Sequence, residues 1–291
     1  MRDQFSISEL CEALAVSRAG FHSWLKKRSA PPSPRRACNQ ALLEAMRKIH
    51  AHRHTRTYGS PRMTIQLQAL GFSCSKSRVA RIMRSHGIRP RPRGRFRPKT
   101  TLQDPSALPS PNLLALRPPP AKPGEQLVSD ITYVPTEEGW LYLAVVVDRF
   151  SRAILGWHVS TSLHADMVTA AIQKALRHGV IRRGALFHSD RGCQYTASQT
   201  RRLLHTLGIL QSMSAKGYCY DNAFAESVFA TLKSDIFPDN HRFTSRAEAL
   251  RQLFDYLETF YNKRRLHSSL GYQTPQKVLS LSFQNSLPTL N

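Results

Sequence analysis

Hydrophobic positions follow three different patterns along the 291-residue chain. Up to about residue 88, apolar residues recur at helical spacing, as in Leu10, Leu14, Phe21 and Leu25. From residue 126, three apolar runs rich in β-branched residues predict strands: "QLVSDITYVP", "LYLAVVVD" and "AILGWHVS". Residues 89–125 lie between these regions and follow neither period. The pattern therefore predicts a helical region, a linker and a region that contains a sheet.

Residues 1–88 are predicted to hold two helix-turn-helix units. In "SISELCEALAVSRAGFHSWLKKR" the helical spacing breaks at "AVSRAG" and resumes near Ser17. In "YGSPRMTIQLQALGFSCSKSRVARIMRSHGI" an apolar stripe ends at Gly71, and a second helix begins near Ser75 or Ser77. The alternative is a pair of ordinary helical hairpins with solvated basic faces. Because such motifs place the second helix in the major groove, DNA contacts are expected from its basic residues. These are Lys76, Arg78, Arg81 and Arg84.

The linker, residues 89–125, begins with "RPRPRGRFRPK", in which Arg alternates with Pro or Gly. Proline removes a backbone donor and disfavours regular helix and sheet, so an extended, semi-rigid strap is expected. Its charge suits contact with phosphates, which position a protein on DNA without reading sequence.

Residues 126–240 predict an α/β fold with a mixed sheet. The turns "TEEGW" and "RFSR" are short enough to join the three runs as antiparallel hairpins. An α-β-α-β-α order follows, with strands at "ALFHSD" and "ILQSMS" and the last helix running through Glu226. Residues 241–291 form a C-terminal region. There Ser245 and Glu248 predict the start of a long apolar helix that packs on the sheet or on a partner.

Charge points to a polyanionic partner. The net charge is +23, and the first 100 residues contribute most of it. Nucleic acid is the favoured partner, and an anionic membrane surface is the alternative. No run of about 18 apolar residues and no signal-peptide core occur, which favours a cytoplasmic protein. The five cysteines are scattered, which is typical of a reduced compartment.

A zinc site is the alternative use of one histidine cluster. "HAHRH" places His50, His52 and His54 close together, with Cys38 and Cys74 in range. Zinc ligands usually come in close pairs from both halves of a site, and these cysteines are single. A basic helix face is the better interpretation.

Three carboxylates stand among apolar or small neighbours in the sheet region. Asp130 lies within the first strand, Asp190 at the end of the fourth, and Glu226 on a helix that can cross the same end. Each alone has an ordinary interpretation as a surface or turn residue. Together they suit two-metal phosphoryl transfer, in which Mg²⁺ takes oxygen ligands and Mn²⁺ can substitute. Asn222 and Lys233 share the helix face of Glu226, and both are expected near DNA.

Four blocks of sequence then resemble one known family. They are "DITYVPTEEGWLYLAVVVDRFSR", "HSDRGCQYTA", "SMSAKGYCYDNAFAESVFATLKSD" and "FYNKRRLHSSLGYQTP". The resemblance is to the transposase encoded by the second reading frame of insertion-sequence family three. It covers nearly the whole chain, because the N-terminal helical segments also match. It implies an RNase H-like catalytic core, like that of retroviral integrases, within residues 126–240.

The resemblance implies roles for individual residues. The family pattern has two aspartates and a glutamate, with 35 residues between the second and third, as between Asp190 and Glu226. Asp130, Asp190 and Glu226 are thus the implied catalytic and metal-binding triad, and Lys233 matches the family's basic residue. The chain departs from the family in lacking Trp before Asp130 and in carrying Cys193 in place of a small hydroxyl residue. Neither departure removes an implied ligand.

The implied activity is a metal-dependent DNA transposase. It would cleave one strand at each element end and join the resulting 3′-OH to another phosphodiester. Two alternatives stay open: a nuclease of the same fold without strand transfer, and a non-catalytic DNA-binding regulator of transposition. Arg264 and Arg265, in the C-terminal "NKRRLH" turn, are expected to hold target DNA or a partner subunit.

The implied partners follow from the same family. They are double-stranded DNA at element ends and target, an upstream-frame protein with a helix-turn-helix and a leucine zipper, and further copies of the chain on DNA. No membrane partner is expected. The implied location is the bacterial cytoplasm, in association with the nucleoid.

Overall fold

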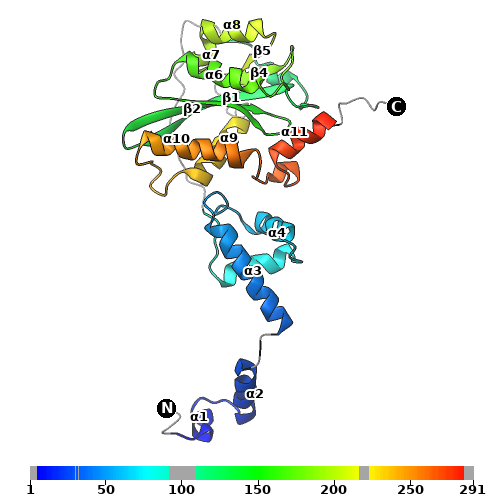
Figure 1. Cartoon of the computed structure of the whole chain (residues 1–291), viewed down its shortest axis with the longest axis vertical. Coiled ribbons are helices and arrows are strands. Elements are labelled where there is room, and N and C mark those ends of the chain that lie inside the picture. Colours follow the sequence, from blue (N-terminus) through cyan, green and yellow to red (C-terminus); the bar gives the residue numbers. More distant parts are fainter. Residues whose placement is uncertain (1–4, 30, 32, 92–108, 216–222, 285–291) are drawn as a thin grey trace, which may run out of the picture.

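A computed structural model describes residues 5–29, 31, 33–91, 109–215 and 223–284. Within these ranges the chain forms a helical N-terminal region followed by a five-stranded mixed sheet with helices on both faces (Figure 1). No helix among these residues combines the length and apolar character needed to cross a membrane.

The helical region contains two pairs of short helices and one longer helix. Its elements are α1 (Ile7–Ala13), α2 (Arg18–Ser29), α3 (Pro34–Ala51), α4 (Ser60–Ala69) and α5 (Lys76–Ser85). The predicted helix starts are confirmed: the Ser17 hydroxyl accepts from the Gly20 amide, and the Ser75 hydroxyl accepts from the Arg78 amide. Apolar residues of α3, α4 and α5 share one small core. In Figure 1, α1 and α2 lie at the far end of the molecule from the sheet.

The sheet has the strand order β3-β2-β1-β4-β5. Its strands are β1 (Gln126–Thr136), β2 (Gly139–Asp148), β3 (Ile154–Ser160), β4 (Leu186–Ser189) and β5 (Leu210–Met213). The first three strands are antiparallel neighbours, whereas β4 and β5 run parallel to β1. The predicted order of three antiparallel strands and then α-β-α-β-α is confirmed, with one extra short helix after β4.

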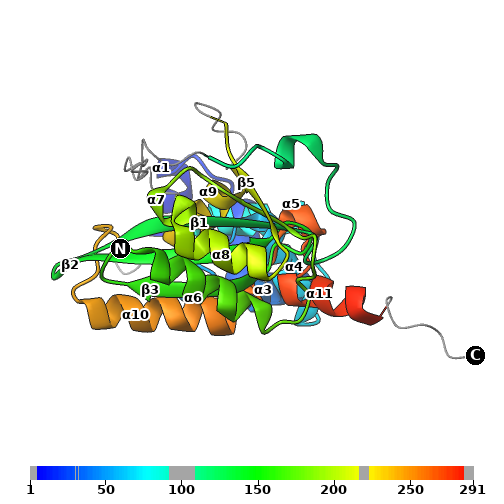
Figure 2. The same cartoon turned by 90° about the horizontal axis from the view of Figure 1, so that it is seen from above.

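Helices cover both faces of the sheet because its central strands are apolar on both sides. On one face lie α6 (Ala165–Leu176), α7 (Cys193–Thr196) and α8 (Ser198–Thr206), seen over the strands in Figure 2. On the other lie α9 (Ala223–Ile236) and α10 (Arg246–Asp255). The Ser245 hydroxyl caps α10, but the Glu248 carboxylate bonds to Thr244.

The predicted C-terminal helix changes its winding part-way. A π-helical segment, Tyr256–Tyr261, continues α10, and the last described elements are a 3-10 turn (Ser268–Leu270) and α11 (Pro275–Gln284). The buried rings of Tyr256, Phe260 and Tyr261 pack into the core that α9 shares with the sheet. This segment therefore closes the sheet face that carries α9.

The helical region docks on that closed face. The Tyr58 ring, fully buried, belongs to the core formed by the sheet, α9 and α10. The Arg62 guanidinium donates to the Leu266 carbonyl over 3.0 Å, and Arg91 donates to the Phe237 carbonyl. The α3–α5 unit is thus fixed against the same elements that hold α9.

Candidate active site

Asp130 lies on β1, and Asp190 directly follows the neighbouring parallel strand β4 at the same level of the sheet. Gln126 of β1 pairs with Leu186 of β4, and Val128 pairs with His188. Continuing that register by two residues places Asp130 beside Asp190. Since neighbouring strands are about 4.8 Å apart, the two carboxylates come from adjacent backbones. The expected meeting of these two acids is therefore supported by the strand register.

A buried tyrosine hydroxyl lies close to both aspartates. Tyr195 of α7 is about 1% exposed, and its hydroxyl lies 3.0 Å from the Ser129 hydroxyl. Burial raises the pKa of Tyr195 well above its ordinary value, and the negative charges of Asp130 and Asp190 raise it further. Tyr195 therefore stays a neutral phenol, which adds no negative charge beside the two carboxylates.

The turn that carries Asp190 is braced by polar contacts. His188, fully buried just before it, contacts the hydroxyls of Ser212 at 2.9 Å and Ser214 at 3.1 Å. The Asp190 carboxylate accepts from the Gly192 amide at 3.0 Å. These contacts tie β4 to β5 and fix the direction of the turn.

Glu226 lies on the helix that faces Asp130. Side chains alternate along a strand, so Asp130 shares a face of β1 with Val134, which packs in the same core as Val228 and Leu232 of α9. Glu226 is exposed in the first turn of α9. Among the residues that the structure describes, no group of three or more His, Cys, Asp or Glu side chains is placed to hold a metal ion. The structure thus places Asp130 and Asp190 next to each other, but Glu226 does not join them in a three-carboxylate metal site.

Carboxylate oxygens are the hard ligands that Mg²⁺ prefers, so the side chains of Asp130 and Asp190 are chemically suited to bind this divalent cation.

Lys233 supplies positive charge next to Asp130. It is half-buried on α9, and burial lowers the pKa of its ammonium group, while the negative charge of Asp130 opposes that change. Lys233 is therefore a neighbour of Asp130 rather than a remote surface residue.

The basic residues expected to contact DNA differ in their surroundings. Lys76, Arg81 and Arg84 are exposed on α5, and Arg264 is exposed beyond the π-helical segment. The Arg78 guanidinium donates twice to the Asn39 side chain of α3, at 2.7 and 3.0 Å. Asn222 lies outside the described residues.

The expectation that Arg265 contacts DNA or a partner is wrong. Its guanidinium is about 3% exposed and donates to the Asp235 carboxylate over 2.6 Å, in a pair buried on both sides. Sequence position in the basic "NKRRLH" turn gave no sign of this, because the acidic partner lies 30 residues away on α9.

Asp235 joins three parts of the structure through its carboxylate, and the sequence analysis did not single it out. Besides Arg265, its carboxylate accepts from the Tyr256 hydroxyl at 2.7 Å and from the Thr57 hydroxyl at 2.8 Å. Its partners come from the helical region, the π-helical segment and the turn that follows. Asp235 thus anchors the C-terminal end of the helix whose first turn carries Glu226.

The alternative zinc site is absent from the described residues. The His54 ring is buried and contacts the Asp255 carboxylate at 3.0 Å, and it lies tilted against the Phe260 ring at a centroid distance of 4.8 Å. Cys38 is exposed on α3. The histidine cluster therefore forms part of the contact between the helical region and the C-terminal helix.

Comparison with known proteins decides the family. An HTH-like domain model matches residues 37–96, and two integrase core domain models match residues 120–219 and 207–275. Transposase InsF for insertion sequence IS3A of Escherichia coli (strain K12) is 37% identical over 278 residues, which cover 94% of each chain. The chain belongs to the IS3 family of transposases.

Two further similarities complete the comparison. The insertion element IS600 uncharacterized 31 kDa protein of Shigella sonnei is 35% identical, over 91% of this chain and 96% of that protein. The catalytic core domain of BIV integrase aligns with a TM-score of 0.40 at 19% identity, over 56% of this chain and 97% of that one. The 37% identical relative and the domain models confirm the family resemblance found in the sequence, and the transposase acts as a polynucleotidyl transferase on DNA.

Proposed function

We propose that Asp130, Asp190 and Glu226 form the catalytic and metal-binding triad of this transposase. The observation that carries the proposal is the strand register, which sets Asp130 beside Asp190 on the sheet face covered by the helix of Glu226. Glu226 completes the trio when α9 engages the DNA and the metal. We expect Mg²⁺ as the ion, held by these three carboxylates, with Mn²⁺ as a substitute.

The reaction requires two successive phosphoryl transfers. Water breaks a phosphodiester at each element end and leaves a 3′-OH. That hydroxyl then attacks a second phosphodiester, so one P–O bond forms as another breaks, and no covalent link to the protein is needed. When bound, the metal ions would activate the attacking oxygen and offset charge on the leaving one.

The chain's own residues would position and balance this chemistry. Tyr195, neutral and fixed by Ser129, limits the negative charge around the aspartates. The ammonium of Lys233 offsets the charge of Asp130 and would meet a DNA phosphate that approaches α9. We propose Asn222, which precedes Glu226 by four residues in the sequence, as a further DNA contact.

DNA would be held mainly by the helical region, residues 1–88, assisted by the linker of residues 89–125, of which 92–108 lie outside the described part of the chain. Lys76, Arg81 and Arg84 present exposed charge for phosphates, and Arg78 is a further candidate on the same helix. Arg264 would contribute from the C-terminal region, residues 241–291. An upstream-frame helix-turn-helix protein and further copies of the chain would complete the assembly on the element ends.

The test is a strand-joining assay with supercoiled plasmid, Mg²⁺ and a labelled terminal oligonucleotide with a free 3′-OH, with and without the upstream-frame protein. Wild-type protein should join label to plasmid, whereas Asp190→Asn should lower joining by on the order of 100-fold or more. A matched control, Asp166→Asn, removes an exposed acid from α6 and should retain joining.

Two outcomes would contradict the proposal. Nicking without any joining by folded wild-type protein would indicate a nuclease. No nicking, together with equal DNA affinity with and without Mg²⁺, would indicate a regulator that binds DNA without catalysis.

A further inference from the structure

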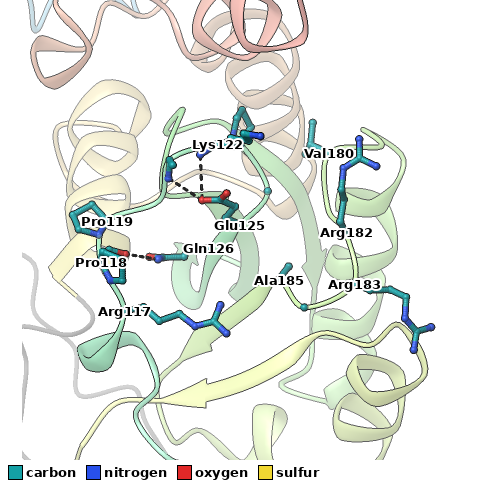
Figure 3. A pocket seen from close by; sticks show the side chains of 14 residues that line it. Arg117, Pro118, Pro119, Lys122, Glu125, Gln126, Val180, Arg182, Arg183 and Ala185 are labelled. Carbon is teal, nitrogen blue, oxygen red and sulfur yellow. Dashed lines mark hydrogen bonds between the residues drawn. The ribbon is translucent and has the colours of Figure 1, made fainter. Parts of the chain in front are cut away.

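A basic pocket lies at the opposite end of β4 from Asp190. The pocket has a volume of about 570 Å³ and lies between the end of the strap and the loop that precedes β4. Figure 3 shows Arg117 on the strap at one side of the pocket, and Arg182 and Arg183 on the loop at the other side. Ala185 lines the pocket, and Asp190 follows five residues later. At about 3.3 Å per residue, the pocket and the aspartates are roughly 16 Å apart.

The pocket carries a strong excess of positive charge. Arg117, Lys122, Arg182 and Arg183 line it, and Glu125 is the acid among the lining residues. The Glu125 carboxylate accepts from the amides of Ala121 at 2.8 Å and Lys122 at 3.2 Å (Figure 3). No ion pair between described residues includes any of the four cations, and all four side chains are exposed. Their charge is therefore available to a ligand.

The pocket walls are held in place by the sheet. The Gln126 side chain donates to the Pro118 carbonyl over 2.7 Å, and the Gly124 amide donates to the buried Asp148 carboxylate over 2.8 Å. A Cβ added at Gly124 would lie 2.2 Å from the Val180 carbonyl oxygen, so the strap and the loop are packed in direct contact. The shape is thus built into the fold before any ligand binds.

We propose that this pocket binds the phosphodiester backbone of DNA, outside the active site. Guanidinium groups on two walls match phosphate oxygens in charge and in hydrogen-bonding geometry. Along the axis of a duplex, each strand presents a phosphate about every 3.4 Å, so a duplex that crosses the aspartates spans the distance to the pocket. This inference rests on DNA binding by the transposase family and on the proposed active site at the aspartates, whereas its test measures DNA binding alone and is independent of catalysis by those carboxylates.

The test measures the salt dependence of DNA binding by the full chain in EDTA, where catalysis is excluded. For a duplex of arbitrary sequence, log affinity falls with log salt, and the double variant Arg182→Ala/Arg183→Ala should make this negative slope shallower by about 2. The double variant Arg182→Lys/Arg183→Lys should restore most of that slope. The control Arg251→Ala/Lys277→Ala removes two exposed cations from α10 and α11 and should keep the wild-type slope.

Hydrogen exchange locates the contact directly. DNA should slow amide exchange in residues 117–126 and 180–185 of wild-type protein, and less so in the Arg182→Ala/Arg183→Ala variant. A wild-type slope in that variant, or unchanged exchange in both segments, would overturn the proposal. So would protection by inorganic phosphate or by polyglutamate when DNA gives none, since the site would then serve a small anion or an acidic protein.

Discussion

At the scale of single residues, the buried pair of Arg265 and Asp235 shows why position in a basic sequence does not establish a DNA contact. A buried carboxylate that loses its cation is costly, because no solvent replaces the lost interaction. Thr57 and Tyr256 donate to the same carboxylate, so the pair also joins the helical region to the core. The residue expected to hold DNA is instead part of the internal framework.

Arg265→Met should therefore lower the free energy of unfolding by about 3–5 kcal/mol. The matched control is Arg53→Met, which breaks an ion pair with Asp255 whose side chains are 44% and 40% exposed. That change should cost under about 1 kcal/mol, since solvent screens an exposed pair. Chemical denaturation of both variants measures the difference, and equal losses would show that burial of the Arg265 pair is unimportant.

His267 makes stability depend on pH. Burial lowers the pKa of its imidazole from 6.5 to about 3, and the charge of Arg265 contributes in the same direction. The unfolded chain therefore binds a proton that the folded chain excludes. Stability is retained above pH 6.5 and is lost as the pH falls from 6.5 toward 3.

Between pH 3 and 6.5, His267→Phe should reduce the slope of the free energy of unfolding against pH by roughly 1 kcal/mol per pH unit. The phenyl ring can keep the edge contact with Tyr261, whose ring centroid lies 5.1 Å away. Unfolding of wild type and variant at several pH values gives the difference between the two slopes. Parallel curves for the two proteins would contradict a neutral buried imidazole.

At the scale of elements, the close approach of α6 to β3 depends on one glycine. A Cβ added at Gly156 would lie 2.0 Å from the Ala171 carbonyl oxygen and 2.7 Å from the Ala175 amide nitrogen. Both are backbone atoms, so the helix itself would have to move. Gly156 therefore sets the distance at which α6 covers the sheet.

Gly156→Ala should lower the free energy of unfolding by about 1–3 kcal/mol, or more where the helix cannot adjust. Gly59→Ala is the control, because the nearest atom to an added Cβ there, in Pro90, is 3.6 Å away. That substitution should cost a few tenths of a kcal/mol to about 1 kcal/mol as an exchange at the helix N-cap. If Gly156→Ala lowers the free energy of unfolding no more than Gly59→Ala does, the close approach of α6 to β3 is contradicted.

Elements with a clear local signal could be predicted from the sequence, and those decided by tertiary contacts could not. Alternating or continuous apolar runs predicted β1 to β5, and serine caps predicted the starts of α2 and α5. The short helix α7 begins at Cys193, three residues after Asp190, and its Tyr195 is fixed by a distant partner, Ser129. Likewise the π-helical winding of Tyr256–Tyr261 accompanies the packing of three aromatic rings, which no local pattern specifies.

In the candidate site, too, the residues with a local sequence signal could be predicted, and those defined by tertiary contacts could not. Asp130, Asp190 and Glu226 could be singled out because each acid interrupts an apolar context, and the family resemblance added their spacing. The polar residues around them gave weaker signals. His188 lies in a continuous buried strand, where its two serine partners on and after β5 become evident only from the pairing of β4 with β5.

At the scale of the whole molecule, the helical region and the core meet where α9 is anchored. Thr57, Tyr58 and Arg62 all contact elements that hold the C-terminal half of this helix or the turn beside it. The first turn of α9, with Glu226, lies at the other end. DNA held by the helical region would therefore lie on a unit that is rigidly joined to the helix bearing the third carboxylate.

The most direct test of this account is the rate of strand joining by Glu226→Gln beside its matched control, Glu137→Gln, an exposed acid in the β1–β2 turn. If Glu226 completes the site with Asp130 and Asp190, joining should fall by on the order of 100-fold or more in the first variant. It should stay near the wild-type rate in the second. Wild-type joining by folded Glu226→Gln protein would contradict the triad and leave the two aspartates to act without it.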